Sequence, residues 1–398
     1  MPQSTRIDRV RGCMLGLAIG DALGAPLEGL GAQQIRAHYQ LVTDYVDGSR
    51  AWKKKPFRWR LPGLYSDDTQ QAMALSDVLL EHGRIDLDRL AGLYLELATP
   101  EGSYVGAHRG VGRSFRQVLT ELKRGVRPDQ TGQGSAGIGA AMRIAPVALF
   151  FSDDPESLHD AVLAASLMTH KDVRSIAGAM AVAHAVRRLV SGAGRDPSFL
   201  FRVAGDTARA EEQIGREAGE AVVSLEAHGR SLSQAIAATE SLLDIPRERA
   251  LSAIAEEANK HGADPVCKRA TMGFPPACIP ACLYLLLATD SFEEALTEVV
   301  NLGGDADSTG AILGALAGAH YGVDAIPARW LDGLQNRDGI EARALALAQR
   351  SSRGITIPDL VATEQTLSAR ETACRTDLIT LSRTPNANGG DLGANRRI

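Results

Sequence analysis

Carboxylate and hydroxyl side chains gather at two points of the chain where a helix is expected to begin. The first cluster is Ser66, Asp67 and Asp68, and the second follows a Gly-Gly pair and contains Asp305, Asp307 and Ser308. Helix capping alone would explain either cluster, because one acid or hydroxyl satisfies free N–H groups of the first turn and suits the helix dipole. Each cluster nevertheless offers two carboxylates and a hydroxyl, which is more than a cap requires.

Four aspartates that met in the folded protein without a Lys or Arg among them would repel one another strongly. Divalent cations would remove that repulsion. Carboxylate and hydroxyl oxygens suit hard ions such as Mg²⁺ or Mn²⁺ better than Zn²⁺. The two clusters therefore predict a metal site, provided that the fold brings the two helix starts together. The glycines at 303 and 304 permit the tight bend that would turn both acids of the second cluster to one side.

Helical periodicity dominates the segments that must position these clusters. Apolar residues recur with helical spacing over residues 9–23, 68–80, 87–97, 138–151, 158–167, 173–190, 211–227, 232–242, 249–257, 279–288, 292–300, 308–321 and 341–348. Alternating runs of Val, Ile, Thr and Tyr are nearly absent, and aromatic residues make up only 5% of the chain. We therefore predict an all-α fold.

Glycine recurs at every fourth position in two of these predicted helices. One stripe is Gly12, Gly16, Gly20 and Gly24, and the other is Gly310, Gly314, Gly318 and Gly322. Each interior glycine costs a helix about 1 kcal/mol relative to alanine, so close packing must offset the loss. A bare stripe lets a second helix approach closely. We therefore place both helices at the centre of the molecule, next to the acidic residues that flank them.

Charge and composition argue against several classes of protein. The net charge is −5, and the densest basic run is Lys53 to Lys55 in a predicted loop, so nothing indicates nucleic-acid binding. No stretch of 18 uncharged apolar residues predicts a membrane span. The five scattered cysteines indicate a reducing cytoplasm, and we interpret Cys278 and Cys282 as buried thiols. The short apolar stretch behind Arg11 resembles a secretion signal only loosely, because Asp21 follows at once.

Irregular segments separate or follow the helices. Residues 45–65, 125–137 and 258–276 are long loops, which in compact domains tend to be functional or disordered. After Arg350 the chain becomes polar and loses its period. We therefore predict a polar extension over residues 351–398, disordered from residue 384 onward.

Several motifs together resemble the signature of the ADP-ribosylglycohydrolase family. They are the two acidic clusters, the sequence GCMLGLAIGDALGAPLE at residues 12–28, GAAMR at 139–143, Thr169-His170, and the stretch 303–322. They follow the order of the family, and the resemblance extends from about residue 8 to about residue 335. It implies a compact single-domain orthogonal helical bundle, here residues 1–350, with a dinuclear Mg²⁺ centre.

The resemblance also assigns roles to residues of this chain. It implies two Mg²⁺ ions, with Mn²⁺ as an alternative, held by Ser66, Asp67, Asp68, Asp305, Asp307 and Ser308. The family usually has Thr at both serine positions, and Ser keeps the hydroxyl. Glu28, beyond a break at Ala25-Pro26, matches an acid of a mobile loop beside the substrate ribose, although alone it would be interpreted as a surface acid. We expect Glu28, Asp68 and Asp307 to be the catalytic candidates.

Ligand-binding residues are implied by the same resemblance. They are Gly134, Ser135, Gly137, Gly139, His170 and Phe274, with the backbone N–H groups of the glycine-rich loop directed at a diphosphate. No strand precedes this loop, so it is not a dinucleotide-binding fingerprint. The family commonly has Asn where this chain has Ile138, and a lost hydrogen bond to a charged group costs roughly 1.5–3 kcal/mol. Residues 108–110 either line the acceptor side of the site or lie at the surface.

The resemblance implies a metal-dependent hydrolase that cleaves the C1″ bond of ADP-ribosylated substrates and releases ADP-ribose. ADP-ribosyl-arginine on a protein is the first choice, and serine-linked, O-acetyl-linked and nucleic-acid-linked ADP-ribose are alternatives. A binding or structural protein of the same fold is a different class of function, to which Ile138 points. Four mutually repelling aspartates argue against that class. We expect a cytoplasmic monomer whose partners are an ADP-ribosylated protein and ADP-ribose.

Overall fold

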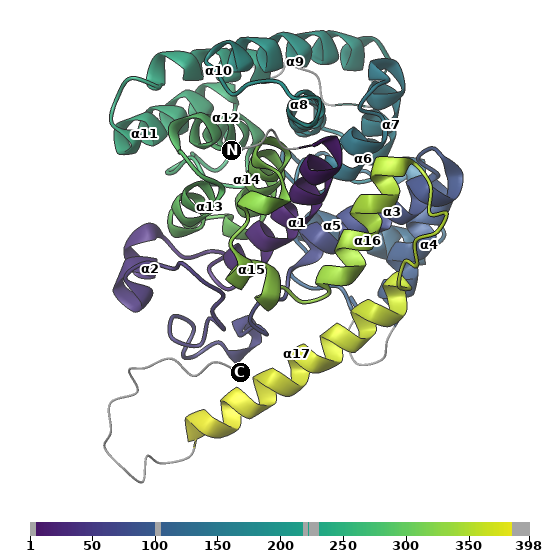
Figure 1. The fold of residues 1–398 in the computed structure, drawn as a ribbon, viewed down its shortest axis with the longest axis vertical. Helices are drawn as coiled ribbons and strands as arrows, with labels where there is room; N and C mark the ends of the chain where they lie inside the picture. Colours follow the sequence, from purple (N-terminus) through teal and green to yellow (C-terminus); the bar gives the residue numbers. More distant parts are fainter. Residues whose placement is uncertain (1–4, 100–104, 218–221, 223–230, 384–398) are drawn as a thin grey trace.

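The computed structural model describes residues 5–99, 105–217, 222 and 231–383 (Figure 1). Every regular element in these ranges is a helix, and strand pairing is limited to two isolated bridges, so the all-α prediction is confirmed. The α-helices are α1 (Arg6–Gly24), α2 (Ala32–Tyr39), α3 (Asp67–His82), α4 (Leu87–Leu97), α5 (Arg113–Lys123), α6 (Ala145–Phe150), α7 (Pro155–Leu167), α8 (Val173–Val190), α9 (Ser198–Glu217), α10 (Leu232–Ala238), α11 (Arg247–Ala258), α12 (Pro275–Ala288), α13 (Phe292–Asn301), α14 (Ala306–Tyr321), α15 (Ala328–Gly333), α16 (Arg337–Gln349) and α17 (Leu360–Arg383).

Helices α1 and α14 lie side by side at the centre of the molecule (Figure 1). Their glycine stripes face each other so closely that a Cβ atom on Gly16 would lie 2.2 Å from the carbonyl oxygen of Gly314. Likewise, a Cβ on Gly20 would lie 1.9 Å from the carbonyl oxygen of Gly310. The glycine stripes therefore allow the close helix packing that the sequence predicted. They also place the end of α1 beside the start of α14.

Several boundaries differ from the prediction. Only Ala145–Phe150 of the predicted helix 138–151 is helical, because residues 138–144 form turns around the cavity described below. The sequence did not indicate α2 or α5, which are short and mostly polar. Helix α9 begins at Ser198, earlier than expected, and residues 218–221 and 223–227 of the predicted helix 211–227 lie outside the described residues.

The chain after Arg350 contains a helix that the sequence did not indicate. Leu360–Arg383 form α17, a helix of 24 residues that runs along the body and then projects beyond it (Figure 1). Its buried positions include Leu360, Glu364, Leu367 and Glu371, which have helical spacing. Two of these four buried residues are glutamates. The sequence of α17 therefore lacks the regular spacing of apolar residues by which a packed helix is predicted. The predicted disorder from residue 384 lies outside the described residues.

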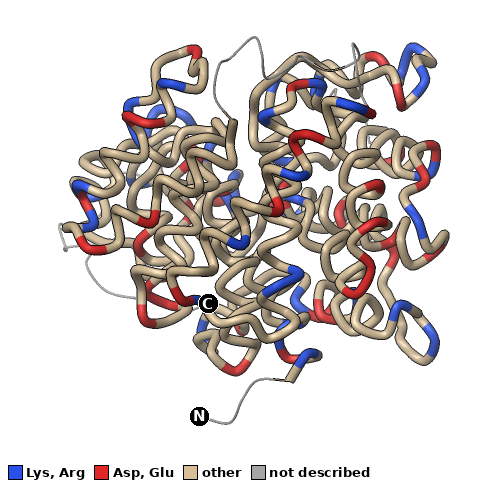
Figure 2. Tube along the Cα trace, turned by 90° about the horizontal axis from the view of Figure 1, so that it is seen from above, with Lys and Arg blue, Asp and Glu red and all other residues tan. Residues whose placement is uncertain are grey.

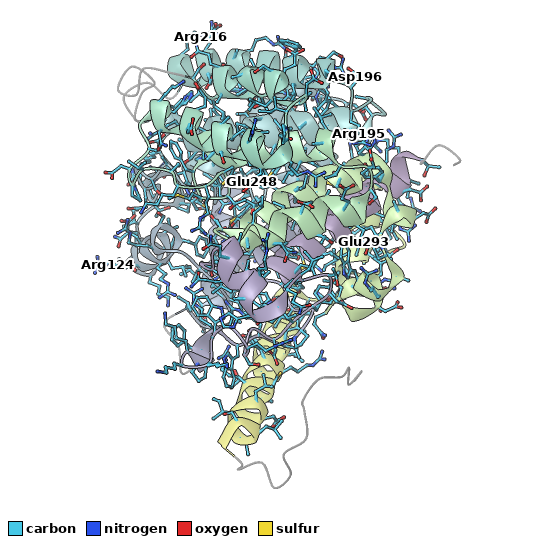
Figure 3. All side chains as sticks on the ribbon, turned by 90° about the vertical axis from the view of Figure 1, so that its left-hand side faces the viewer. Arg124, Arg195, Asp196, Arg216, Glu248 and Glu293 are labelled. Atoms are coloured by element: carbon cyan, nitrogen blue, oxygen red, sulfur yellow. The ribbon has the colours of Figure 1, made fainter. Side chains whose placement is uncertain are left out.

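Charged residues are distributed evenly over the described trace. Figure 2 shows Lys and Arg interspersed with Asp and Glu, and the charged residues labelled in Figure 3 come from several different helices and loops. No helix of the described ranges is long and apolar enough to cross a membrane. All five cysteines are free thiols, and Cys278 and Cys282 are buried as expected.

Candidate active site and metal centre

The two acidic clusters meet at one cavity. Asp67 and Asp68 at the start of α3, together with Asp305 and Asp307 at the start of α14, line a cavity of about 640 Å³. Glu28 lines the same cavity from the segment that follows α1. The fold therefore brings the two helix starts to the same cavity.

Asp21, a buried acid near the end of α1, fixes the start of α3. Its carboxylate accepts hydrogen bonds from the backbone N–H of Ser66 at 2.7 Å and from the backbone N–H of Thr69 at 3.0 Å. It also accepts a bond from the Thr69 hydroxyl at 2.6 Å. Sequence analysis gave Asp21 no role, although a charged residue within an otherwise apolar and glycine-rich helix is a signal that could have revealed it.

We expect Asp21→Ala to destabilise the protein and disturb the start of α3. The substitution leaves the N–H groups of Ser66 and Thr69 without an acceptor, and each unsatisfied buried donor costs about 1–3 kcal/mol. The free energy of unfolding, measured in urea, should fall by roughly 2–4 kcal/mol. Asp21→Asn, which keeps one acceptor oxygen, should lose less than Asp21→Ala. Equal stability of the wild type and the alanine variant would contradict this role.

The second cluster is held by a tight turn. Gly303 and Gly304 have φ angles of 68° and 83°, which favour glycine. The Asp305 N–H donates to the carbonyl of Thr271 at 2.8 Å. A Cβ atom on Gly273 would lie 2.3 Å from an Asp305 carboxylate oxygen, so the absence of a side chain there leaves room for the acid. The predicted role of the Gly-Gly pair thus matches the geometry.

The segment with Glu28 is joined directly to this turn. The N–H of Gly304 donates to the carbonyl of Leu30 at 2.8 Å, and the N–H of Gly29 donates to the carbonyl of Gly304 at 2.7 Å. The Glu28 carboxylate forms an ion pair with Arg58 at 2.8 Å. Glu28 therefore sits at the cavity, held between the second acidic cluster and the loop of residues 45–65.

The four cavity aspartates have no counter-charge within the described residues. Asp67, Asp68 and Asp307 are buried, and Asp305 is partly exposed. None of them pairs with a Lys or Arg of the described ranges. Burial, then the negative charges of Asp21 and Glu28, raises the pKa of Asp67 to about 8. Burial and neighbouring carboxylates also raise the pKa values of Asp68 and Asp307. Such an arrangement is unfavourable unless a cation is bound.

These residues fit hard divalent cations. One carboxylate oxygen of Asp68, Oδ1, is buried and has no hydrogen-bond partner, which leaves it available as a ligand. Within the described ranges, no three His, Cys, Asp or Glu side chains are arranged around one point to hold a metal ion. Mg²⁺ does not need such a group, because it is usually held by one or two carboxylates and retains several waters. Pairs of aspartates with hydroxyl and water oxygens therefore fit it.

The two serines have different positions. Ser308 lines the cavity, whereas Ser66 lies behind it and donates its hydroxyl to Asp68 at 2.9 Å. The Ser66 hydroxyl also caps α3 by accepting from the Asp68 N–H. In the structure, Ser66 therefore orients a carboxylate rather than facing the cavity.

The predicted ligand-binding residues lie in one continuous space. Ser135, Gly137, Gly139 and His170 line the cavity of the aspartates. Gly134 and Phe274 line a second cavity of about 760 Å³. Ser135 and Gly137 belong to the walls of both, so the two cavities adjoin. An extended ligand could therefore reach from the aspartates to Phe274.

The His170 ring explains two of the glycines. A Cβ atom on Gly139 would lie 2.9 Å from the ring, and one on Gly137 would lie 3.6 Å from it. The ring nitrogen Nδ1 shares a hydrogen bond of 2.8 Å with the Thr169 hydroxyl. Burial, then the charge of Arg143, lowers the pKa of His170 to about 3. His170 is therefore neutral at pH 7, so it supplies no positive charge to a ligand but can form hydrogen bonds to it.

The sequence left open whether residues 108–110 line the acceptor side of the site or lie at the surface, and the structure gives a different answer for two of them. His108 and Arg109 are buried, line neither cavity and are not at the surface. Gly110 does line the cavity, and a Cβ atom on it would lie 3.1 Å from an Asp67 carboxylate oxygen. The sequence also gave no indication of the basic cavity residues Arg113 and Lys268, which belong to no motif.

Comparison with known proteins places the chain in a family. The ADP-ribosylglycohydrolase family profile matches residues 2–356, so the chain belongs to the ADP-ribosylglycohydrolase family. It is 31% identical to an uncharacterized protein of Archaeoglobus fulgidus, over 87% of this chain and 98% of that protein. It is 28% identical to the ADP-ribosyl-(dinitrogen reductase) glycohydrolase of Rhodospirillum rubrum, over 84% of this chain and 93% of that protein.

A solved structure supports the same fold. The protein resembles a chain of an ADP-ribosylglycohydrolase-related protein complex with a TM-score of 0.61 and 29% sequence identity. The match covers 87% of this chain and 99% of that chain. The family resemblance and the fold class expected from the sequence are thus confirmed.

Proposed function

We propose that this protein hydrolyses the C1″ glycosidic bond of ADP-ribosylated proteins and releases ADP-ribose, with ADP-ribosyl-arginine as its substrate. The observation that carries the proposal is the convergence of Asp67, Asp68, Asp305 and Asp307 on one cavity, beside Glu28. The adjoining cavity provides space for the rest of an ADP-ribosyl group. The Rhodospirillum relative is an ADP-ribosyl-(dinitrogen reductase) glycohydrolase, which supports a protein-linked substrate.

The four aspartates and the Ser308 hydroxyl would hold two Mg²⁺ ions, or Mn²⁺ in their place. Ser66, which the sequence suggested as a further ligand, would position Asp68. When bound, the two ions would lower the pKa of a coordinated water and fix the ribose hydroxyls. Asp68, Asp307 or Glu28 would accept the proton of the attacking water, and the acceptor would leave as the bond to C1″ breaks.

The other cavity residues would bind the remainder of the substrate. Backbone N–H groups from Gly134 to Gly139 would contact the diphosphate, and His170 would support this loop in its neutral form. Phe274 would pack on the distal part of the ligand. Ile138 is buried and lines the cavity, so it supplies no hydrogen bond where the family commonly has Asn. We therefore expect weaker ADP-ribose binding than an Asn at this position would give.

Metal removal should abolish the activity. We expect purified protein to release ADP-ribose from ADP-ribosyl-arginine with Mg²⁺ and to release none with EDTA, because the bound ions activate the water. Chromatographic measurement of ADP-ribose tests this, and restoring excess Mg²⁺ to the EDTA sample is the control. ADP-ribose binding without release from arginine-, serine- or nucleic-acid-linked substrates would instead support a binding protein of the same fold.

We also propose that the protein acts as a cytoplasmic monomer. The five free cysteines are consistent with a reducing compartment. Sedimentation of the purified protein would measure its oligomeric state.

A further inference from the structure

Helix α17 follows the residues that match the family profile, yet two of its glutamates are buried. The match ends at residue 356, and α17 spans Leu360–Arg383. Glu364 and Glu371 face the body of the protein, with side-chain exposures of 0% and 7%. Buried carboxylates require specific partners, and these partners lie in the segments that lead to the active site.

Glu364 is bound to three groups around the start of α3. Its carboxylate accepts hydrogen bonds from the Tyr65 hydroxyl at 2.5 Å and from the Gln70 side-chain amide at 2.6 Å. It also forms a buried ion pair with Arg109. Tyr65 directly precedes the first acidic cluster, and Gln70 follows it in the first turns of α3. The Glu364 carboxylate therefore binds one residue on each side of the cluster in the sequence.

Arg109 extends this network to the backbone. Its guanidinium Nε donates to the carbonyl oxygen of Tyr65 at 3.1 Å, and its backbone N–H donates to Gln70 at 3.0 Å. The next residue, Gly110, packs against Ser66 and Asp67, because a Cβ on Gly110 would lie 3.1 Å from either side chain. A movement of Arg109 would therefore shift the backbone that carries the first cluster.

Glu371, the second buried glutamate of α17, contacts the loop that supports Glu28. Glu371 pairs with Arg60 at 3.4 Å and with Arg375 at 3.2 Å. The Arg375 side chain donates to the carbonyl of Trp59 at 3.3 Å. Trp59 and Arg60 directly follow Arg58, which holds the Glu28 carboxylate. Helix α17 thus contacts the loop that supports the Glu28 segment as well as the start of α3.

We propose that α17 is a positioning element of the active site, in which Glu364 fixes the backbone around Asp67 and Asp68, and Glu371 fixes the loop around Arg58. Its role in activity rests on the proposed hydrolase function. Without the Glu364 charge, the buried Arg109 guanidinium would lose the carboxylate with which it forms an ion pair. The segment from Tyr65 to Gln70 would then open locally to hydrate it. Helices packed on the far side, such as α8, would not be affected.

Hydrogen exchange of the full-length protein tests this inference directly. In Glu364→Gln, amides of residues 62–72 and 107–111 should exchange about tenfold faster or more, while those of α8 stay unchanged. Gln365→Ala, at the adjacent exposed position, is the matched control and should leave all three regions unchanged. Unchanged exchange at residues 62–72 would overturn the proposal. An equal increase in α8 would also overturn it, because it would show a general loss of stability.

Steady-state kinetics of the Glu364 variants provide a second test of the proposal. Glu364→Gln should lower kcat by about 10–100-fold, because small displacements of catalytic groups are costly. The affinity for ADP-ribose should hardly change, since the partners of Glu364 are Tyr65, Gln70 and Arg109 and not residues of the glycine-rich loop. Glu364→Asp should restore part of kcat. A loss confined to ADP-ribose affinity would contradict positioning of the aspartates.

Two further results distinguish a failure of the proposed hydrolase function from a failure of the proposal for α17. If the wild type hydrolyses no ADP-ribosyl substrate, the proposed function fails, and the exchange data still decide the role of α17. If Glu364→Gln does not fold, Glu371→Gln replaces it, because Glu371 lies further along the helix. That variant should accelerate exchange at residues 48–61 and leave α8 unchanged. Unaltered exchange at residues 48–61 would overturn the proposal.

Discussion

Asp305→Asn should lose nearly all hydrolytic activity and still fold. Asp305 belongs to the cavity acids that would hold a cation, and Asn cannot supply the same charge. We expect kcat/KM to fall at least about a hundredfold, because loss of a metal ligand would remove an ion that activates the attacking water. ADP-ribose release at saturating Mg²⁺ measures the effect.

The same variant should be more stable than the wild type when metal is absent. Burial raises the pKa of Asp305, which means that its ionised form opposes folding. Asn removes that charge at nearly constant volume, so the unfolding midpoint in EDTA should rise. The wild type should instead be stabilised by Mg²⁺, and the variant should respond much less.

Asp324→Asn is a suitable control for this experiment. Asp324 is exposed and lies just beyond the far end of α14, away from the cavity. Its activity and its Mg²⁺ response should equal those of the wild type. Near-full turnover by Asp305→Asn would exclude the dinuclear mechanism, and loss of activity in Asp324→Asn would show that the effect is not specific.

The sequence predicted those features of the fold that depend on a repeated pattern. Glycines at every fourth position indicated the contact between α1 and α14, because only bare backbone explains such a costly series. The clusters at Asp67 and Asp305 were recognised because they exceed what a helix cap needs. Their convergence could not be derived from the residues, since it depends on how α1 ends beside α14.

Other features escaped because their partners are distant in the sequence. Glu364 resembles a solvent-exposed acid in a polar segment, and only its pairing with Arg109 makes it a core residue. Arg109 itself was assigned to the acceptor side or to the surface, although it is 5% exposed. Asp21 has no neighbour in sequence that reveals its bonds to Ser66 and Thr69. A buried charge does not reveal its distant partner in the sequence. Sequence analysis can therefore single out a residue such as Asp21 but cannot derive the bonds that it forms.

Gly16→Ala should be among the most destabilising single-methyl changes in this protein. The new Cβ atom would lie 2.2 Å from the Gly314 carbonyl oxygen, and backbone atoms cannot move aside as a flexible side chain can. Helices α1 and α14 would have to separate, which moves Asp21 relative to the second acidic cluster. We expect a loss of about 3 kcal/mol or more in the free energy of unfolding, at the upper end of the cost of overpacking.

Gly215→Ala makes the same chemical change where the surroundings are open. Gly215 lies in α9, and no atom of the described residues outside the backbone of its own helix is within 4 Å of the position of a new Cβ. Alanine there should stabilise the protein by about 0.5–1 kcal/mol, because it is the better helix former. Urea unfolding of the two variants should therefore give effects of opposite sign. If Gly16→Ala were as stable as the wild type, close backbone contact could not be what the glycine stripes provide, and the acidic clusters would have to be held together by other means.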